Sequence, residues 1–217
     1  MRQSNSDVPH NPTWLSQQEH EKYSSFRIEK RRQDWVLGRW TMKKLAAHFL
    51  HISFPDFLRI EIFAAGDGAP ELYFDAQPVR QTISLSHREH FAIAALTDSD
   101  MKMGCDLEFV EPRSKVFMSD YFTTNENVLV QKFNNSALYA NFIWTAKEAT
   151  VKALREGLRL DTRAVEVVEL KKDTEQFTFK MQYHKTDTPY WGQAVLFDGF
   201  IAAFVCERSQ FKMIRIN

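Results

Sequence analysis

Two carboxylates, Asp106 and Glu108, stand two residues apart in the otherwise apolar segment "MGCDLEF". Successive side chains of a β-strand point to opposite faces, so the two acids would share one face, with their Cβ atoms roughly 7 Å apart. The apolar residues Met103, Cys105 and Leu107 would share the other face. Two negative charges on one face repel each other unless water, a cation or an arginine offsets them. The segment therefore predicts a strand whose acidic face either lies in water or binds a cation.

A second charged pair lies in "SALYANFIWTAKEATVKALREG", whose apolar spacing predicts the strongest helix of the chain, stopped by Gly157. Glu148 precedes Lys152 by four residues, which is the favourable order for a helical ion pair and requires no further role. Trp144 and Val151 share their face, so we expect Glu148 to be only half solvated.

Together, Asp106, Glu108 and Glu148 would offer hard oxygen ligands to a divalent cation. Mg²⁺ usually binds few protein carboxylates and completes its octahedral shell with substrate phosphates and water. The Asp-x-Glu spacing also occurs in many strands that bind no metal, so the spacing alone leaves both interpretations open. His87 alone is typical of an ordinary strand-end residue, because no His or Cys ligand pattern accompanies it.

Composition limits the other classes of function. Lysine plus arginine and aspartate plus glutamate number 28 each among 217 residues, which argues against a nucleic-acid partner. The chain has no G-x-S-x-G, Walker A or G-x-G-x-x-G motif. No apolar run reaches the ~18 residues of a membrane span, and the polar first residues lack the apolar core of a signal peptide. We therefore expect a cytoplasmic protein with no membrane partner, in which Cys105 and Cys206 are free thiols, with a disulfide as the alternative.

The apolar and turn patterns predict helices followed by strands, twice over. Ser16 and Glu19 have the spacing of a capping box, and "EKRRQDWVLGRWTMKKLAAHFLHI" predicts a long helix whose dense basic residues form a solvated face. Strands are predicted at "FLRIEIFA", "TISLS", "FAIAALTD" and "MKMGCDLEF", and again at "AVEVVEL", "QFTFKMQYH", "GQAVLF" and "FIAAFVCE". The pattern predicts an α+β chain of two halves, residues 1–100 and 101–217, with no visible sequence repeat between them.

The turn signal "TDSD" predicts a hairpin between the strands on either side of it. A two-residue turn there would place Asp106 opposite Phe91. Ser86 and His87 would then lie just beyond the end of the hairpin that carries the two carboxylates.

Three segments in order, "ISLSH", "GCDLE" and "WTAKEATVK", resemble the signature of the 4′-phosphopantetheinyl transferases, specifically the larger, two-half class typified by the surfactin-synthetase activator. The family patterns look like S-x-S-H, G-[IVC]-D-[IL]-E and [FW]-[STC]-x-K-E-[AS]-x-x-K. One such motif would be weak, whereas three in register are specific. The resemblance covers most of the chain and also includes "LSQQEHEKYSSF", "RRQDWVLGRW" and "DYFTTNE".

The resemblance implies a pseudo-dimer of two similar α+β halves with the active site in the cleft between them. Such enzymes move the 4′-phosphopantetheine arm of coenzyme A to a serine of an apo acyl or peptidyl carrier protein and release adenosine 3′,5′-bisphosphate. The implied function is thus a Mg²⁺-dependent holo-[acyl-carrier-protein] synthase, a transferase of post-translational modification and secondary metabolite biosynthesis.

The resemblance also implies roles for single residues. Asp106, Glu108 and Glu148 would bind Mg²⁺, and Glu148 would act as general base on the serine, directly or through a metal-bound water. Lys152 would neutralise a phosphate oxygen of coenzyme A and orient the leaving group. His87 would contact a coenzyme A phosphate.

Further coenzyme A contacts are implied in the first half, the coenzyme A-binding half. Ser86 would lie beside the phosphate contact of the neighbouring histidine. Among the basic residues of the long helix, Lys30 and Arg31 are the candidates for the 3′-phosphate, with Arg32 and Arg39 as alternatives.

Two departures from the family pattern leave a second hypothesis. Ala69 stands where a G-K-P turn commonly has lysine, and Arg88 stands where a serine often follows the histidine. The alternative is a catalytically idle relative that binds coenzyme A or carrier proteins. A third hypothesis, an unrelated metal-dependent phosphoryl-transfer enzyme or nuclease, is disfavoured by the charge balance. A two-half chain supplies its own cleft, so a monomer is sufficient.

An apolar stripe follows the acidic segment in "VFMSDYF". Such a stripe is typical of a core, and the alternative is that part of it contacts an apolar helix of the carrier protein.

Overall fold

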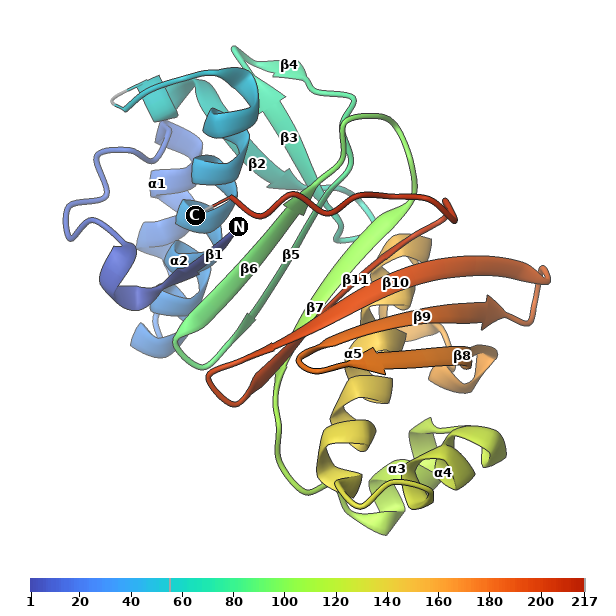
Figure 1. Cartoon of the computed structure of the whole chain (residues 1–217). Coiled ribbons are helices and arrows are strands. Elements are labelled where there is room, and N and C mark those ends of the chain that lie inside the picture. The colour runs from blue at the N-terminus through green and yellow to red at the C-terminus, as the bar shows by residue number, and fades with distance from the viewer. Residues whose placement is uncertain (55, 217) are drawn as a thin grey trace. The chain divides into compact units, whose positions relative to one another are not determined.

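The computed structural model describes residues 1–54 and 56–216, which form two compact units. One unit contains Met1–Met101 and the C-terminal residues from Met213 onward, and the other contains Lys102–Lys212. The described residues form five α-helices and eleven strands, so the chain is of mixed α+β class (Figure 1). None of the described helices is long and apolar enough to cross a membrane.

The first unit combines two helices with two small antiparallel sheets, ordered β1-β6-β5 and β2-β3-β4. Its elements are β1 (Arg2–Ser4), α1 (Gln17–Ser25), α2 (Glu29–Leu50), β2 (Ile60–Ala64), β3 (Pro70–Phe74), β4 (Gln77–Pro78), β5 (Ile83–Arg88) and β6 (Phe91–Leu96), with short 3₁₀ turns at Asn5–Asp7 and Asp56–Arg59. The predicted capping box is confirmed, because the Ser16 N–H donates to Glu19 Oε2 at 3.1 Å and the Glu19 N–H donates to Ser16 Oγ at 3.4 Å.

The second unit packs one long helix on a five-stranded antiparallel sheet ordered β7-β11-β10-β9-β8 (Figure 1). Its elements are β7 (Met103–Phe109), α3 (Lys115–Tyr121), α4 (Thr124–Gln131), α5 (Ser136–Leu154), β8 (Val165–Asp173), β9 (Gln176–Tyr183), β10 (Thr188–Phe197) and β11 (Phe200–Cys206), with 3₁₀ turns at Gly157–Arg159 and Thr162–Ala164. The predicted helix and the four C-terminal strands are confirmed. The helix ends earlier than Gly157, because Arg155 already adopts the left-handed conformation at φ 58°.

The predicted hairpin at "TDSD" is wrong. β6 pairs with β5 and β1, whereas β7 pairs with β11, which places Asp106 opposite Ala203 rather than Phe91. A short turn is a local signal, but the partner of a strand is set by which neighbour buries its faces, and that neighbour lies far along the chain. Ser86 and His87 therefore do not lie at the end of a hairpin that carries the two carboxylates.

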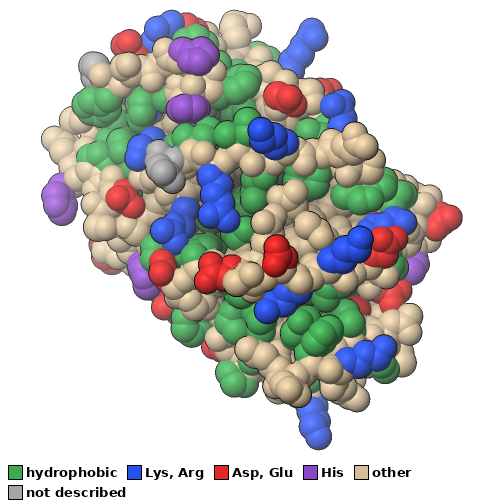
Figure 2. Space-filling view, in the orientation of Figure 1, with side chains coloured by type: hydrophobic (Ala, Val, Ile, Leu, Met, Phe, Trp, Pro, Cys, Tyr) green, Lys and Arg blue, Asp and Glu red, His purple; other side chains and the backbone are tan. Residues whose placement is uncertain are grey.

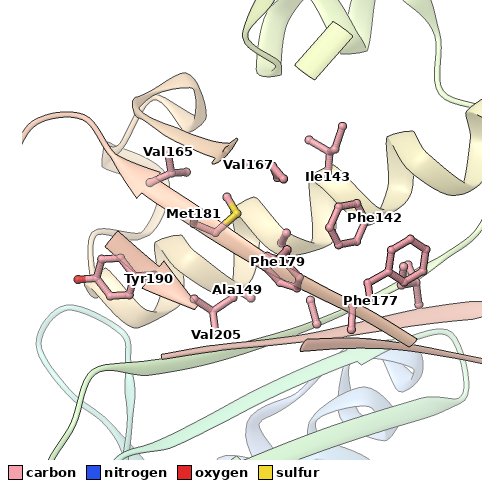
Figure 3. Close-up of a cluster of buried hydrophobic side chains, with 14 of the residues drawn as sticks. Phe142, Ile143, Ala149, Val165, Val167, Phe177, Phe179, Met181, Tyr190 and Val205 are labelled. Carbon is pink, nitrogen blue, oxygen red and sulfur yellow. The ribbon is translucent and has the colours of Figure 1, made fainter. Parts of the chain in front are cut away.

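The core of the second unit forms between α5 and one face of the sheet. Figure 3 shows Phe142, Ile143 and Ala149 of α5 facing side chains from the strands, among them Phe177 and Phe179. The rings of Phe142 and Phe177 stack with centroids 4.7 Å apart. This packing fixes α5 against the sheet and so fixes the polar face of the helix as well. Cys105 and Cys206 are buried free thiols, as predicted.

Each unit contains a buried lysine–glutamate pair among its described residues. In the second unit, Nζ of Lys147 on α5 lies 2.6 Å from Oε2 of Glu126, and both side chains are fully buried. Glu126 is the third residue of α4, where it closes a capping box with Thr123. In the first unit, Lys43 of α2 pairs with Glu19, the third residue of α1, in the same way. The prediction that the basic residues of α2 lie on a solvated face is therefore wrong for Lys43, which is buried.

The two pairs lie in similar sequence contexts, "WTMKK" and "WTAKE". Thr41 and Thr145 each donate to the carbonyl oxygen four residues earlier, at 2.7 Å in both cases. The two glutamates accept backbone N–H groups of Ile62 and Val167, at 3.3 Å and 3.0 Å, from the first strand after each long helix. A short repeat thus exists in the chain, and it became visible only through these shared contacts.

We expect Lys147→Met to lower the free energy of unfolding by about 3–5 kcal/mol, because it leaves the Glu126 carboxylate buried without its cation. Lys180→Met is the matched control, since Lys180 forms a 3.4 Å ion pair with the exposed Glu169, and such surface pairs contribute about 0–1 kcal/mol. Urea unfolding of both variants measures the difference. Equal losses in the two variants would contradict a structural role for the buried pair.

On the face drawn in Figure 2, Lys and Arg side chains are interspersed with Asp and Glu side chains, in keeping with the equal numbers of the two charges.

Candidate active site

β7 and α5 approach each other so closely that only glycine fits at residue 104. A Cβ atom on Gly104 would collide with the carbonyl oxygen of Ala149 and would lie 2.7 Å from the backbone nitrogen of Ala153. Alternate residues of a strand share a face, so Asp106 and Glu108 face α5 together with Gly104. The sequence-based prediction that the two acids share one face is thereby consistent with the strand that forms.

α5 carries three polar side chains at four-residue intervals along the side that meets β7. The indole Nε1 of Trp144 donates to Oε1 of Glu108 at 3.0 Å, and Nζ of Lys152 donates to Oδ1 of Asp106 at 2.8 Å. Glu148 lies one turn from each of them on the helix. The three predicted metal ligands and the predicted phosphate-binding lysine thus belong to one acidic site on β7 and α5, which we define as Asp106, Glu108, Glu148 and Lys152.

Burial and like charge raise the pKa of Glu148 from its ordinary value of 4.5 to about 7. The largest cause is burial, followed by the charge of Asp106, while Lys152 lowers the pKa and Glu108 raises it further. A carboxyl group with this pKa gains and loses its proton near neutral pH, as a general base at that pH should.

The Lys152 ammonium is held by the acids around it. Its Nζ also donates to the carbonyl oxygen of Cys105 at 3.1 Å, and its side chain is 33% exposed. Burial disfavours the charge, but the attraction of Asp106 and Glu148 outweighs burial and raises the pKa of Lys152 above its ordinary value of 10.5. Lys152 therefore stays a cation at the edge of the acidic site.

Arg113 is the residue of this site that the sequence argument missed. Its Nη2 donates to Oε2 of Glu108 at 3.1 Å, and its Nε donates to Oδ1 of Asn141 at 2.8 Å. The physical signal was available, because paired strand carboxylates require water, a cation or an arginine. What the sequence could not give was the path of the loop that returns Arg113 to the strand.

The donor chemistry of the acidic site suits Mg²⁺. Among residues 1–54 and 56–216, no three His, Cys, Asp or Glu side chains are arranged as a ready metal cluster, and Asp106 and Glu108 bond instead to protein cations and to an indole. The three carboxylates still act on one another, since both strand acids raise the pKa of Glu148. A divalent cation would offset that repulsion with the oxygen ligands that Mg²⁺ prefers. The residues therefore fit such an ion, provided that a carboxylate oxygen shares or exchanges its present partner.

The predicted coenzyme A contacts outside this site all belong to the first unit. Ser86 is buried and His87 exposed near the end of β5, and Lys30 and Arg31 are exposed in the first turn of α2. Arg32, an alternative, forms an ion pair with Glu29 at 2.9 Å. His87 on β5 and Lys30 and Arg31 on α2 are therefore accessible to a ligand, whereas Ser86 is not.

The first unit has a counterpart to the acidic face, with different charges. Gln3 on β1 occupies the position that Glu108 occupies on β7, because each residue lies opposite the second residue of its partner strand, β6 or β11. Lys44 holds in "WTMKK" the position that Glu148 holds in "WTAKE". Nζ of Lys44 donates to Oε1 of Gln3 at 3.2 Å. A lysine–amide hydrogen bond thus replaces the repelling carboxylates in the first unit.

We expect Glu148→Gln to stabilise the metal-free protein at pH 8.5 and to leave its stability almost unchanged at pH 4. The folded-state pKa of about 7 lies above the ordinary 4.5. The protonated Glu148 side chain is therefore tolerated fully below pH 4.5, and its ionisation lowers the free energy of unfolding as the pH rises through 7. This rise in pKa converts to at most roughly 3.5 kcal/mol of lost folding stability, and because Glu148 is partly exposed to water we expect a loss of about 1–2 kcal/mol.

Urea unfolding in EDTA at the two pH values measures this difference. A gain from Glu148→Gln at pH 4 as large as that at pH 8.5 would contradict the raised pKa. Glu169→Gln, on the exposed side of β8, is the control and should show no such pH dependence.

Residues 102–205 match the sequence model of the 4′-phosphopantetheinyl transferase superfamily. The matched segment contains β7, α5 and all four residues of the acidic site. No curated protein matched the chain.

Proposed function

We propose that this protein transfers the 4′-phosphopantetheine arm of coenzyme A to a serine of an apo acyl or peptidyl carrier protein, in a Mg²⁺-dependent reaction. The observation that carries the proposal is the coincidence of the superfamily match with the acidic site: the matched segment brings Asp106, Glu108, Glu148 and Lys152 together on one strand and one helix. The match supports a transferase of this superfamily, and the choice of coenzyme A, Mg²⁺ and carrier protein is our inference.

Asp106, Glu108 and Glu148 would hold Mg²⁺, which supplies charge neutralisation at the pyrophosphate. The serine Oγ attacks the phosphorus of the phosphopantetheine arm, and the bond from that phosphorus to the bridging oxygen breaks. Glu148 accepts the serine proton as general base. Lys152 neutralises a phosphate oxygen, so that adenosine 3′,5′-bisphosphate can leave.

The first unit is proposed to contribute the remaining coenzyme A contacts. Ser86 and His87 would contact a phosphate, and Lys30 and Arg31 would bind the 3′-phosphate. Exposure of both basic side chains and of the imidazole supports this role. We further propose that the two units correspond to the two similar α+β halves of this enzyme class, an idea supported by the lysine–glutamate pair that each unit contains.

The carrier protein is proposed to dock on α3, beside the acidic site. Val116 and Tyr121 are 69% and 40% exposed, whereas Phe122 of the same stripe is buried. The stripe therefore divides between the surface and the core. Phe117 and Tyr121 both contact the ring of Trp144, with centroids 4.9 Å and 5.1 Å away, so a partner on α3 would lie next to Glu108.

Product analysis tests the proposed reaction. Coenzyme A, Mg²⁺ and an apo carrier protein are mixed with the protein, and the nucleotides are separated by chromatography. Release of adenosine 3′,5′-bisphosphate that requires the carrier would support transfer. Coenzyme A binding without release, across several acyl and peptidyl carriers, would instead support the alternative of a catalytically idle binding protein, for which Ala69 in the "GDGAP" turn is the sequence argument.

A further inference from the structure

The loop between β7 and α3 carries an arginine that the proposed reaction does not use. Arg113 is only 15% exposed, although it lies in a loop. Its guanidinium donates at one end to Glu108 and at the other to Asn141, at 3.1 Å and 2.8 Å. Asn141 is fully buried on α5 and donates to the carbonyl oxygen of Glu111 at 2.6 Å, which fixes the loop to the helix. Arg113 is thus held in place by a residue of the core.

Aromatic side chains complete the surroundings of Arg113. Its guanidinium carbon lies 5.0 Å from the ring centroid of Phe117, and that ring meets Trp144 edge-on with centroids 4.9 Å apart. Trp144 in turn donates to the second oxygen of Glu108, at 3.0 Å. Arg113, Phe117, Trp144 and Glu108 therefore form a closed ring of contacts, in which the two carboxylate oxygens of Glu108 are held from different elements.

We infer that Arg113 is a positioning residue that holds the Glu108 carboxylate in the acidic site and thereby sets the affinity of that site for a divalent cation. The inference rests on the proposed function, in which Glu108 is a metal ligand. Without Arg113, repulsion from Asp106 and Glu148 favours rotamers of Glu108 that point into water. Binding of a divalent cation must then include the free-energy cost of returning the Glu108 side chain to its ligating rotamer, so the affinity for the cation falls. Hydrogen-bond partners of metal ligands commonly change metal affinity by about 10–100-fold.

An effect of charge alone would change the cation affinity in the opposite direction. If Arg113 acted only as a counter-ion that competes with the metal, its removal would leave the site more negative and would tighten cation binding. The direction of the change therefore separates positioning from competition. Lysine at the same position separates them again, because it keeps the charge but has no fixed fork that could donate to Glu108 and Asn141 at once.

The test is a titration of the full chain with Mn²⁺, followed by electron paramagnetic resonance of the free ion. We expect Arg113→Met to raise the Mn²⁺ dissociation constant about tenfold over wild type, and Arg113→Lys to restore little of the loss. Arg59→Met is the matched control, since Arg59 also pairs with an aspartate, Asp75, at 2.6 Å and lies 4.7 Å from the centroid of Phe74. It should bind Mn²⁺ as wild type does.

A double-mutant cycle shows whether the effect passes through Glu108. In the Glu108→Gln background, Arg113→Met should cause no further loss, and a full additional loss would overturn the inference. Wild-type or tighter binding by Arg113→Met, or full rescue by Arg113→Lys, would also overturn it. If Arg113→Met fails to fold by circular dichroism, Arg113→Lys carries the test.

The Mn²⁺-binding result for Arg113 can be distinguished from a failure of the proposed transfer reaction. A wild-type protein that binds no Mn²⁺ overturns the inference and the metal site together. A protein that binds Mn²⁺ but transfers nothing to a carrier contradicts the proposed function, while the effect of Arg113 on Mn²⁺ binding is still measured.

Discussion

Replacing Asp106 with asparagine is expected to lower the rate of transfer at least about 100-fold and to abolish its dependence on Mg²⁺. The variant keeps the shape of a side chain that is nearly buried and close to Lys152, but it removes the carboxylate charge. One metal ligand is lost, and Lys152 loses the acid to which it donates. Initial rates over a series of Mg²⁺ concentrations measure both effects.

Asp173→Asn is the control for this experiment, since Asp173 is exposed at the end of β8. It should transfer at the wild-type rate with the wild-type Mg²⁺ response. An Asp106→Asn variant that retained the wild-type response to Mg²⁺ would show that Asp106 is not a metal ligand. A variant that lost activity together with its cooperative unfolding transition would point to a fold defect, which circular dichroism detects.

Replacing Glu148 with glutamine is expected to lower turnover by about 10²–10⁴-fold, the usual contribution of a general base, with little change in coenzyme A affinity. The amide keeps an oxygen near the site but cannot accept the serine proton. The raised pKa of Glu148, caused first by burial and then by Asp106, is the property that this substitution removes. Steady-state rates and coenzyme A binding by calorimetry, the latter in EDTA, separate the two quantities.

Near-normal turnover of Glu148→Gln would exclude Glu148 as the base. An equal loss of turnover and of coenzyme A affinity would assign Glu148 to substrate binding instead. Glu169→Gln, the same substitution at an exposed strand position, is the appropriate control.

Local signals predicted much of the fold. The capping box at Ser16, the helix that contains Glu148 and the four C-terminal strands each depend on neighbouring residues, and each was found where the pattern put it. The partner of β7 was not predictable in this way. Its strand mate β11 lies far along the chain, and no turn motif encodes their pairing.

The acidic site likewise has features that the sequence predicted and features that depend on the fold. Strand periodicity was sufficient to predict that Asp106 and Glu108 share a face, whereas their grouping with Glu148 was one of two open interpretations until the family resemblance favoured it. The position of Arg113 depends on a loop that a buried asparagine, Asn141, fixes. The buried state of Lys43 was likewise not predictable, because its ammonium is satisfied by Glu19 and by the carbonyl oxygens of Trp14 and Phe57, which only the fold brings to it.

The most direct test of the central claim is the intact mass of an apo carrier protein after incubation with this protein, coenzyme A and Mg²⁺. We predict that the carrier gains the mass of one phosphopantetheine group, and that the gain disappears with EDTA, with Asp106→Asn and with a carrier whose acceptor serine is replaced by alanine. An unchanged carrier mass across a panel of acyl and peptidyl carriers, with a folded protein that binds coenzyme A, would contradict the claim.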